Sequence, residues 1–222
     1  SLTKALVEKE SNEPLLKETI PLQIPNRLRI NVPDKDKQKL IERLKEKCPD
    51  NSLKKIVLLN ANSSDIVPLR KWPLENFVEL GKILLKNPEI TVVLTGNKVE
   101  KNTCASLAME INPKRTINFA GETSFKELIT LYSISNLLIT NDSGPVHFAS
   151  TTSIPILALF GPETPKIFGP MSPKARVISL GLSCSPCISV FNQKLSSCKD
   201  NQCMKKISIE MVVNETKKIL KK

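Results

Sequence analysis

The segment 140–149 holds the residues best suited to chemistry. Asp142, Ser143 and Gly144 follow an apolar run, and His147 lies three residues further on. A strand that ends in a small polar turn and opens a helix directs free backbone amides and the positive end of the helix at one point. In parallel α/β sheets, such points lie at the carboxyl edge, where ligands bind. The pattern predicts a site for an anion, above all for phosphate.

Two basic residues lie where they could serve the same anion. Arg70 and Lys71 follow a predicted strand-end loop and precede a predicted helix. Positive charge is disfavoured at a helix N-terminus, so this placement makes better sense if an anion lies between the cations and the helix. A solvated pair remains the alternative interpretation.

The usual glycine-rich phosphate loops are missing from the sequence. The chain has seven glycines, and no two of them are separated by a single residue, which excludes the G-x-G-x-x-G fingerprint. The G-x-x-x-x-G-K-[ST] pattern is missing as well. Helix N-termini and side-chain cations are therefore the expected phosphate ligands.

A cluster of cysteines occupies 184–203, with members at Cys184, Cys187, Cys198 and Cys203. The spacing permits a structural zinc site, two disulfides or four reduced thiols. A reducing compartment would disfavour the disulfides. The spacing does not choose between zinc and free thiols.

Apolar periodicity alternates between strand and helix along the chain. Strands are predicted at 55–60, 90–95, 116–119, 137–140, 155–159 and 176–180, and helices at 34–48, 73–86, 99–111, after Ser124 and after Ser208. Repeated strand–helix units predict an α/β fold, a Rossmann-like parallel sheet with helices on both faces.

Local signals mark where several helices begin. Pro73 is expected at the first helical position, with Leu74 directed inward. Ser124 and Ser208 are expected as N-caps, and Ser143 can cap the helix that follows it.

Length and composition limit the class of protein. The 222 residues suffice for one sizeable domain, and prolines interrupt residues 1–33. The net charge of +11 is spread along the chain, which favours a solvated surface first and a basic face for an anionic lipid headgroup or phosphorylated glycolipid second. Nucleic acid comes last, and aromatic residues make up only 4%. No apolar run approaches the roughly 20 residues of a membrane span. The first residue is Ser1 rather than Met, so we expect a piece of a longer protein.

Several motifs in order resemble family 9 glycosyltransferases, the ADP-heptose:lipopolysaccharide heptosyltransferase family. They are Arg-Lys-Trp-Pro at 70–73, Gly-Glu-Thr-Ser at 121–124, Asp-Ser-Gly at 142–144 with His147 and Ala149, Phe-Gly-Pro-x-Thr-Pro at 160–165, and Cys-Met at 203–204. The resemblance runs from about Ile56 to the C-terminus. It implies the C-terminal half of a GT-B fold, with a nucleotide-sugar-binding domain at 34–222. Residues 1–33 would then be the tail of a missing N-terminal acceptor domain and a linker.

The resemblance also implies roles for residues near the phosphates. Arg70 takes the place of a basic residue that meets the diphosphate beside the transferred sugar, with Lys71 next to it. Asn62 and Ser63 lie in a loop that approaches the phosphates. His147 is expected to contact phosphate rather than to act as a base, since charge develops on the leaving diphosphate.

The remaining implied contacts concern the turn at 142–144 and the nucleoside. Ser143, Gly144 and the amides after Asp142 would bind the diphosphate, while Asp142, turned away from it, would orient the loop or the sugar. Backbone around Thr123 would meet the nucleobase, and Glu100 would face the ribose.

The implied reaction is the transfer of a sugar, expected to be heptose, from an ADP-linked donor to a lipopolysaccharide-core or similar glycolipid. It would invert the anomeric centre, require no metal, and take its general base from the missing N-terminal domain, so the chain alone should bind nucleotide without catalysing transfer. The resemblance implies a cytoplasmic enzyme, peripheral at the inner face of the cytoplasmic membrane, with no nucleic acid as partner. The alternative hypothesis is a non-catalytic, basic, zinc-containing module that binds nucleic acid or another anionic partner.

Overall fold

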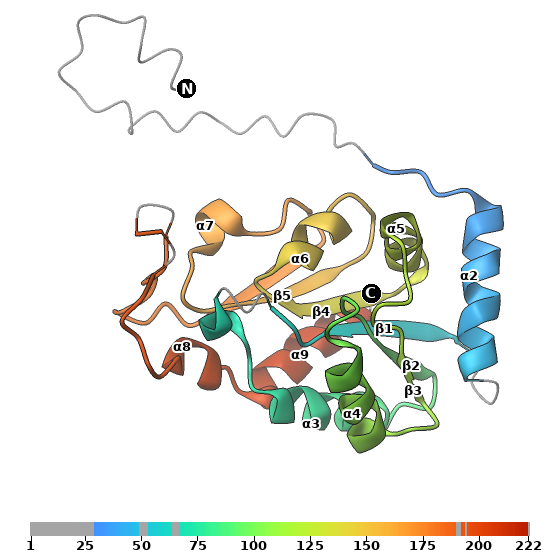
Figure 1. Ribbon diagram of the computed structural model, residues 1–222, viewed down its shortest axis with the longest axis horizontal. Coiled ribbons are helices and arrows are strands. Elements are labelled where there is room, and N and C mark those ends of the chain that lie inside the picture. The colour runs from blue at the N-terminus through green and yellow to red at the C-terminus, as the bar shows by residue number, and fades with distance from the viewer. Residues whose placement is uncertain (1–28, 49–52, 64–66, 190–191, 194, 222) are drawn as a thin grey trace, which may run out of the picture.

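The computed structural model describes residues 29–48, 53–63, 67–189, 192–193 and 195–221 (Figure 1). Predictions for residues 1–28 lie outside this part of the chain. Within it, a parallel sheet of six strands has the order β3-β2-β1-β4-β5-β6. The strands are β1 (Lys55–Asn60), β2 (Ile90–Leu94), β3 (Thr116–Asn118), β4 (Leu137–Asn141), β5 (Ile156–Phe160) and β6 (Ala175–Ser179). All six predicted strands are confirmed, and so is the α/β class.

Helices cover both faces of the sheet, as the alternating pattern predicts (Figure 1). One face carries α2 (Asp34–Lys47), α5 (Phe125–Ile134) and α6 (Gly144–Ala149), and the other carries α3 (Leu74–Leu84), α4 (Lys101–Ile111) and α9 (Ile209–Leu220). Because side chains alternate along a strand, Val57 and Leu59 join the α3–α4–α9 core, while Ile56 and Leu58 join the α2–α5–α6 core.

The strand order places a topological switch between β1 and β4. Their connections leave in opposite directions, β1 toward β2 and β4 toward β5. The register aligns Asn60 with Thr140, so both strands end at the same level of the sheet. A crevice is expected where the connections diverge at this carboxyl edge.

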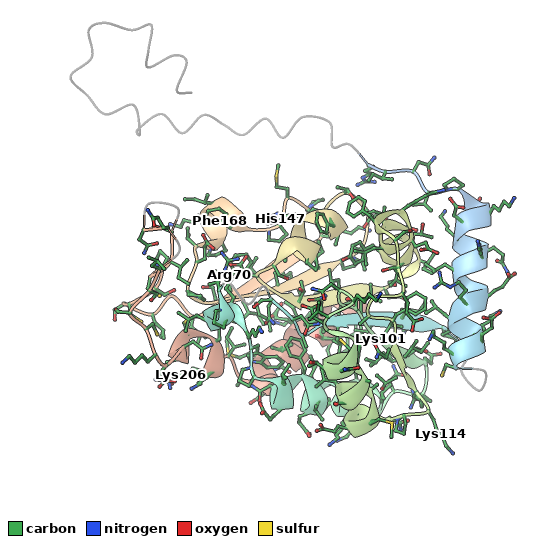
Figure 2. All side chains as sticks on the ribbon, in the orientation of Figure 1. Arg70, Lys101, Lys114, His147, Phe168 and Lys206 are labelled. Atoms are coloured by element: carbon green, nitrogen blue, oxygen red, sulfur yellow. The ribbon has the colours of Figure 1, made fainter. Side chains whose placement is uncertain are left out.

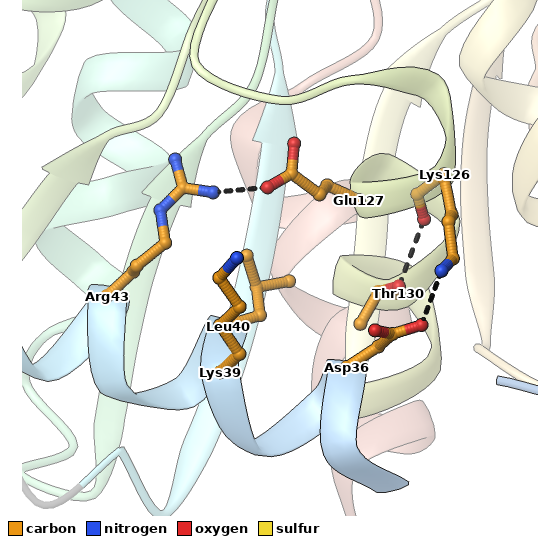
Figure 3. Close-up of a pocket in the computed structure, with 7 residues that line it drawn as sticks. All are labelled: Asp36, Lys39, Leu40, Arg43, Lys126, Glu127 and Thr130. Carbon is orange, nitrogen blue, oxygen red and sulfur yellow. Dashed lines mark hydrogen bonds and ion pairs between the residues drawn. The ribbon is translucent and has the colours of Figure 1, made fainter. Parts of the chain in front are cut away.

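Helix α2 is attached to the side of the domain by apolar and ionic contacts with α5. Leu40 and Leu44 are buried beneath it. Figure 3 shows the small cavity between the two helices, about 170 Å³, and the ion pairs that border it. Lys126 Nζ lies 2.7 Å from Asp36, and Arg43 Nη1 lies 2.6 Å from Glu127. The cavity is therefore a packing feature of the α2–α5 contact.

Residues just before α2 also touch the domain. The Ile30 amide donates to the Thr151 carbonyl at 3.1 Å, and Val32 is buried. This part of the predicted linker thus packs against the loop after α6.

Three local predictions differ from the structure. Pro73 is the N-cap of α3 rather than its first residue, because its ψ of 136° is extended. Leu74 is exposed, since the helix starts with this residue facing solvent. Ser143 occupies the N-cap of α6 without a side-chain cap bond, because its hydroxyl donates to the Asn141 carbonyl instead. The caps at Ser124 and Ser208 are confirmed.

Short helical segments that the sequence pattern did not predict complete the fold. They are η2 (Pro68–Arg70), α7 (Pro165–Phe168) and α8 (Gln202–Lys205). Each has only three or four residues, too few for an apolar period to show.

Candidate nucleotide-binding site

A cavity of about 690 Å³ opens at the carboxyl edge of β1, β2 and β4. The predicted site residues that line it share an origin in loops that follow strands: Asn62, Ser63, Glu100, Thr123, Ser143 and Gly144. The structure therefore brings six residues from four separate loops to one cavity. Its volume falls in the range typical of small-molecule sites.

Buried asparagines at the strand ends hold these loops in place. Asn60 Nδ2 donates to the Thr95 carbonyl at 3.1 Å, which joins the ends of β1 and β2. Asn141 Nδ2 donates to the Ala61 carbonyl at 2.9 Å, and its Oδ1 accepts from the Trp72 amide at 3.1 Å. The backbone beside the cavity thus depends on side chains that satisfy otherwise orphaned buried groups.

Glycines allow the β2 loop to approach its neighbours closely. The Gly121 amide donates to the Gly96 carbonyl at 2.9 Å, and Gly121 has φ +71°. A Cβ on Gly96 would lie 2.8 Å from Glu100 Oε2 and 2.9 Å from Asn62 Nδ2. Glu100 Oε2 in turn accepts from the Asn97 amide at 2.7 Å. The predicted ribose-facing carboxylate is thereby held against this wall of the cavity.

Two exposed phenylalanines form part of the cavity lining. Phe125 is 58% exposed and Phe148 is 39% exposed, and their rings meet edge to face at 5.1 Å between centroids. Exposed rings beside a cavity offer a flat apolar surface to a planar ligand such as a nucleobase. Neither phenylalanine was singled out as a site residue in the sequence.

Beside the cavity lies a buried ion cluster of Arg70, Asp142 and Glu163. Arg70 Nη2 contacts Glu163 Oε2, and Arg70 Nε lies 3.2 Å from Asp142 Oδ2. Exposed fractions of the side chains are 13% for Arg70, 4% for Asp142 and 0% for Glu163. The predicted diphosphate cation is thus held by two carboxylates, of which the sequence analysis identified only Asp142.

Lys71 and His147 lie outside the cavity lining. Lys71 is half-buried, and its backbone carbonyl accepts from Asn201 Nδ2 at 3.2 Å. His147 is exposed on α6 rather than packed against the turn, at the edge of the molecule that Figure 2 shows above Arg70. Their predicted phosphate contacts stay predictions.

The cysteine-rich segment 184–203 braces the loops around the ion cluster. The amides of Cys187 and Ile188 donate to the Pro162 carbonyl at 3.0 and 2.9 Å. Asn201 Nδ2 donates to the Leu69 carbonyl at 3.0 Å. A Cβ on Gly161 would lie 2.9 Å from Cys203 Sγ, which shows how closely this segment approaches the turn after β5.

The cysteine thiols in this segment are free, and Cys203 is the buried one. Burial raises the pKa of the Cys203 thiol, and the nearby thiols of Cys187, Cys198 and Cys184 add to the rise. Among the described residues, no three His, Cys, Asp or Glu side chains come together as ligands for a metal ion.

The residues that sequence reasoning missed are mostly long-range partners. Glu163 occupies the unspecified position of the Phe-Gly-Pro-x-Thr-Pro motif, and Asn60 and Asn141 are the last residues of buried strands. A polar residue that ends an otherwise apolar strand is a usable signal for a loop-positioning group. No local signal marks Glu163, because its partner Arg70 is far away in the sequence.

The fold and the cavity together define a Rossmann-like domain with an open cavity at its topological switch. The sequence model described as glycosyltransferase family 9 (heptosyltransferase) matches residues 5–196. The chain therefore belongs to glycosyltransferase family 9, as its motifs predict.

Curated relatives and solved structures agree with this family. The chain is 34% identical over 116 residues to lipopolysaccharide heptosyltransferase 2 of Salmonella typhimurium, which is 51% of this chain and 33% of the relative. It is 30% identical over 172 residues to lipooligosaccharide heptosyltransferase 2 of Campylobacter jejuni, which is 75% of this chain and 52% of the relative. The chain thus spans about half the length, or less, of these relatives.

Among solved structures, ADP-heptose lps heptosyltransferase II of E. coli superposes with a TM-score of 0.70 at 24% identity. The match covers 86% of this chain and 53% of that one. A family 9 glycosyl transferase from Veillonella parvula gives the same TM-score at 22% identity, with the same coverage. These two likenesses show the fold.

The comparisons do not favour the alternative hypothesis of a basic zinc-containing module. Within the described part of the chain, no helix combines the length and the apolar character that crossing a membrane requires.

Proposed function

We propose that this chain is the donor-binding half of a heptosyltransferase, and that the whole protein transfers heptose from an ADP-linked donor to a lipopolysaccharide-core glycolipid. One observation carries the proposal: six residues implied by the family motifs line a single cavity at the topological switch. Relatives of the same family are lipopolysaccharide and lipooligosaccharide heptosyltransferases. The acceptor-binding site and the general base belong to an N-terminal domain of the same protein. The reaction proceeds at the inner face of the cytoplasmic membrane.

The nucleoside enters the cavity, and the diphosphate lies toward the turn at 142–144. The Phe125–Phe148 pair supports the base, the backbone at Thr123 reads its edge, and Glu100 accepts from the ribose. As the acceptor hydroxyl, deprotonated by the general base, attacks the anomeric carbon with inversion, the bond from that carbon to the diphosphate oxygen breaks and negative charge grows on the departing ADP. Arg70, His147 and the amides at the start of α6 stabilise that charge, which is the task a divalent ion performs in other transferases.

A titration of the folded chain with ADP, UDP and GDP tests the donor assignment. Calorimetry should give saturable binding of ADP and weaker binding of the other two, because the cavity recognises the base. His147→Ala should weaken the binding of ADP more than the binding of adenosine, because the imidazole is proposed to contact phosphate. A folded chain that binds none of the three nucleotides contradicts the proposal.

Two further measurements test whether the general base lies in the N-terminal domain and whether nucleotide binding requires a metal. Residues 1–222 mixed with ADP-heptose and a lipopolysaccharide acceptor should release no ADP above the uncatalysed rate, and release would contradict a base in the N-terminal domain. The ADP affinity should be the same with and without EDTA. A loss of affinity with EDTA would contradict metal-independent binding and would direct attention to the four clustered cysteines.

A further inference from the structure

We propose that Glu163 is a positioning residue that clamps Arg70, so that a single guanidinium nitrogen is presented to the donor diphosphate. The inference rests on the proposed function and concerns a residue that the family motif leaves unspecified. The clamp consists of Glu163, Asp142 and Arg70, which follow β5, β4 and β1 respectively.

Two of the three guanidinium nitrogens lie against carboxylates of the clamp. Arg70 Nη2 donates to Glu163 Oε2, whereas Nε lies 3.2 Å from Asp142 Oδ2 in an ion pair without hydrogen-bond geometry. Nη1 makes no hydrogen bond or ion pair with any residue that the structure describes. Since 13% of the Arg70 side chain remains exposed, Nη1 is the part available to a ligand. A planar guanidinium that is hydrogen-bonded at one corner and ion-paired at a second holds its third corner in one direction.

Among the described residues, Arg70 is the one partner of the buried carboxylate of Glu163. Its side chain is 0% exposed, and Oε1 is buried without a hydrogen-bond partner among the described residues. A buried carboxylate is costly unless it is paired, so Arg70 accounts for its charge. Removing that charge should therefore act mainly on the orientation of Arg70.

The surrounding backbone keeps both ends of the clamp still. Asn201 Nδ2 donates to the carbonyls of Leu69 and Lys71, on either side of Arg70. On the opposite side, the Cys187 amide donates to the carbonyl of Pro162, next to Glu163. The cysteine-rich segment is thus hydrogen-bonded to the backbone beside Arg70 and to the backbone beside Glu163.

The test measures the preference for ADP over AMP, because the clamp acts on the diphosphate and the base contacts are common to both ligands. Calorimetry compares the intact chain with Glu163→Gln, Arg70→Lys and the double variant, each titrated with ADP, AMP and adenosine. Glu163→Gln should lower the ADP:AMP affinity ratio about tenfold, the effect of losing one charge-assisted hydrogen bond, and leave adenosine binding unchanged. The double variant should lose no more than Arg70→Lys alone, because both changes remove the same contact.

A matched control uses Glu215→Gln, which removes a carboxylate from an Arg–Glu pair outside the cavity lining. Its ADP:AMP ratio should equal that of the intact chain. If Glu163→Gln does not fold, Glu163→Asp keeps the charge but shortens the reach, and the same tenfold loss is expected.

Distinct results overturn the clamp. An unchanged ratio in a folded Glu163 variant, or tighter ADP binding from the loss of a repelling charge, shows that Glu163 does not position Arg70. An equal fall for ADP and adenosine shows a purely structural role. An intact chain that binds adenosine but prefers ADP no more than AMP overturns the clamp and leaves the nucleoside site standing. An intact chain that binds no nucleotide overturns the proposed function and the clamp with it.

Discussion

The carboxyl edge of the sheet carries two adjoining regions of opposite character. The cavity over β1, β2 and β4 is open and lined mostly by uncharged groups and two phenylalanines. The clamp over β1, β4 and β5 is closed, and its three charged side chains are nearly buried. The cavity suits a neutral, planar nucleoside, whereas the clamp limits how a cation can meet the phosphates. In the proposed function, the cavity recognises the nucleoside and the clamp acts on the diphosphate, and both regions use the segments that follow β1 and β4.

The largest effect is expected from removing the cation of the clamp. Arg70→Met leaves the Asp142 and Glu163 carboxylates buried without their counter-ion, so the free energy of unfolding should fall by about 3–5 kcal/mol. Urea denaturation measures this change. Lys218→Met, which breaks an exposed ion pair with Glu215, is the control and should change stability by less than about 1 kcal/mol. If both variants lose a similarly small free energy of unfolding, the buried clamp contributes no more to stability than an exposed ion pair.

A smaller effect is expected from the glycine that shapes the cavity wall. Gly121→Ala places a Cβ 2.8 Å from the Lys98 Cα at a residue with φ +71°, and should cost about 2 kcal/mol of unfolding free energy. Its ADP affinity should fall as the wall shifts. Gly181→Ala also has a positive φ, +59°, but meets nothing within 4 Å. It should cost about 1 kcal/mol or less and leave ADP binding intact. Equal losses in the two variants would show that backbone strain alone, without the close contact, decides the cost.

The aromatic lining should affect binding and not folding. Phe148→Ala removes one ring of the edge-to-face pair, and the ADP affinity should fall about tenfold, as expected for a lost base–aromatic contact of roughly 1–3 kcal/mol. Stability should change by no more than about 0.5 kcal/mol. Met211→Ala, at the same 39% exposure but on α9, is the matched control. If the ADP affinity stays the same in Phe148→Ala, the nucleobase does not bind against this side of the cavity.

The smallest effect on stability is expected at the more exposed Arg43–Glu127 pair, which serves as a comparison for the buried clamp. The capping-box hydrogen bond from the Ser124 backbone, followed by its hydroxyl and by Arg43, holds the pKa of Glu127 below its usual 4.5. A lowered pKa in the folded state means that Glu127 stabilises the fold above pH 4.5 and loses this contribution as the pH falls through the folded-state pKa. Glu127→Gln should cost about 0.5 kcal/mol at pH 7, because solvent screens this exposed group. Urea denaturation at a series of pH values should show the difference closing below pH 4.5. A difference that persists at acid pH would assign the effect to packing.

Local rules predict part of the cavity, and the family resemblance supplies the rest. Strands read from apolar runs end where polar residues begin, and parallel strands end at one edge, so Ser143 could be placed at that edge. The resemblance places Ser63 and Thr123 there. Helix starts at Ser124 and Ser208 follow from capping chemistry alone.

The clamp could not be predicted in the same way. Arg70 and Glu163 are paired only after β1, β4 and β5 assemble side by side, and nothing in either local segment specifies the other. Ser143 shows the converse error. Its residue type favours a cap, but a competing carbonyl at Asn141 takes its hydroxyl. Leu74 fails for another reason: it is the first residue of α3 and is exposed, although helical periodicity predicts an inward direction.

The burial of Trp72 determines what the tryptophan fluorescence of this chain can report. Trp72 is the single tryptophan of the chain, its ring is fully buried, and its indole Nε1 donates to the Ile207 carbonyl at 2.9 Å. Its emission should therefore resemble that of an indole in an apolar solvent and shift to longer wavelength only when the segment before α9 detaches. The chain contains its own optical probe of whether its C-terminal segment is docked. That probe reports assembly of the domain more directly than it reports an occupied cavity.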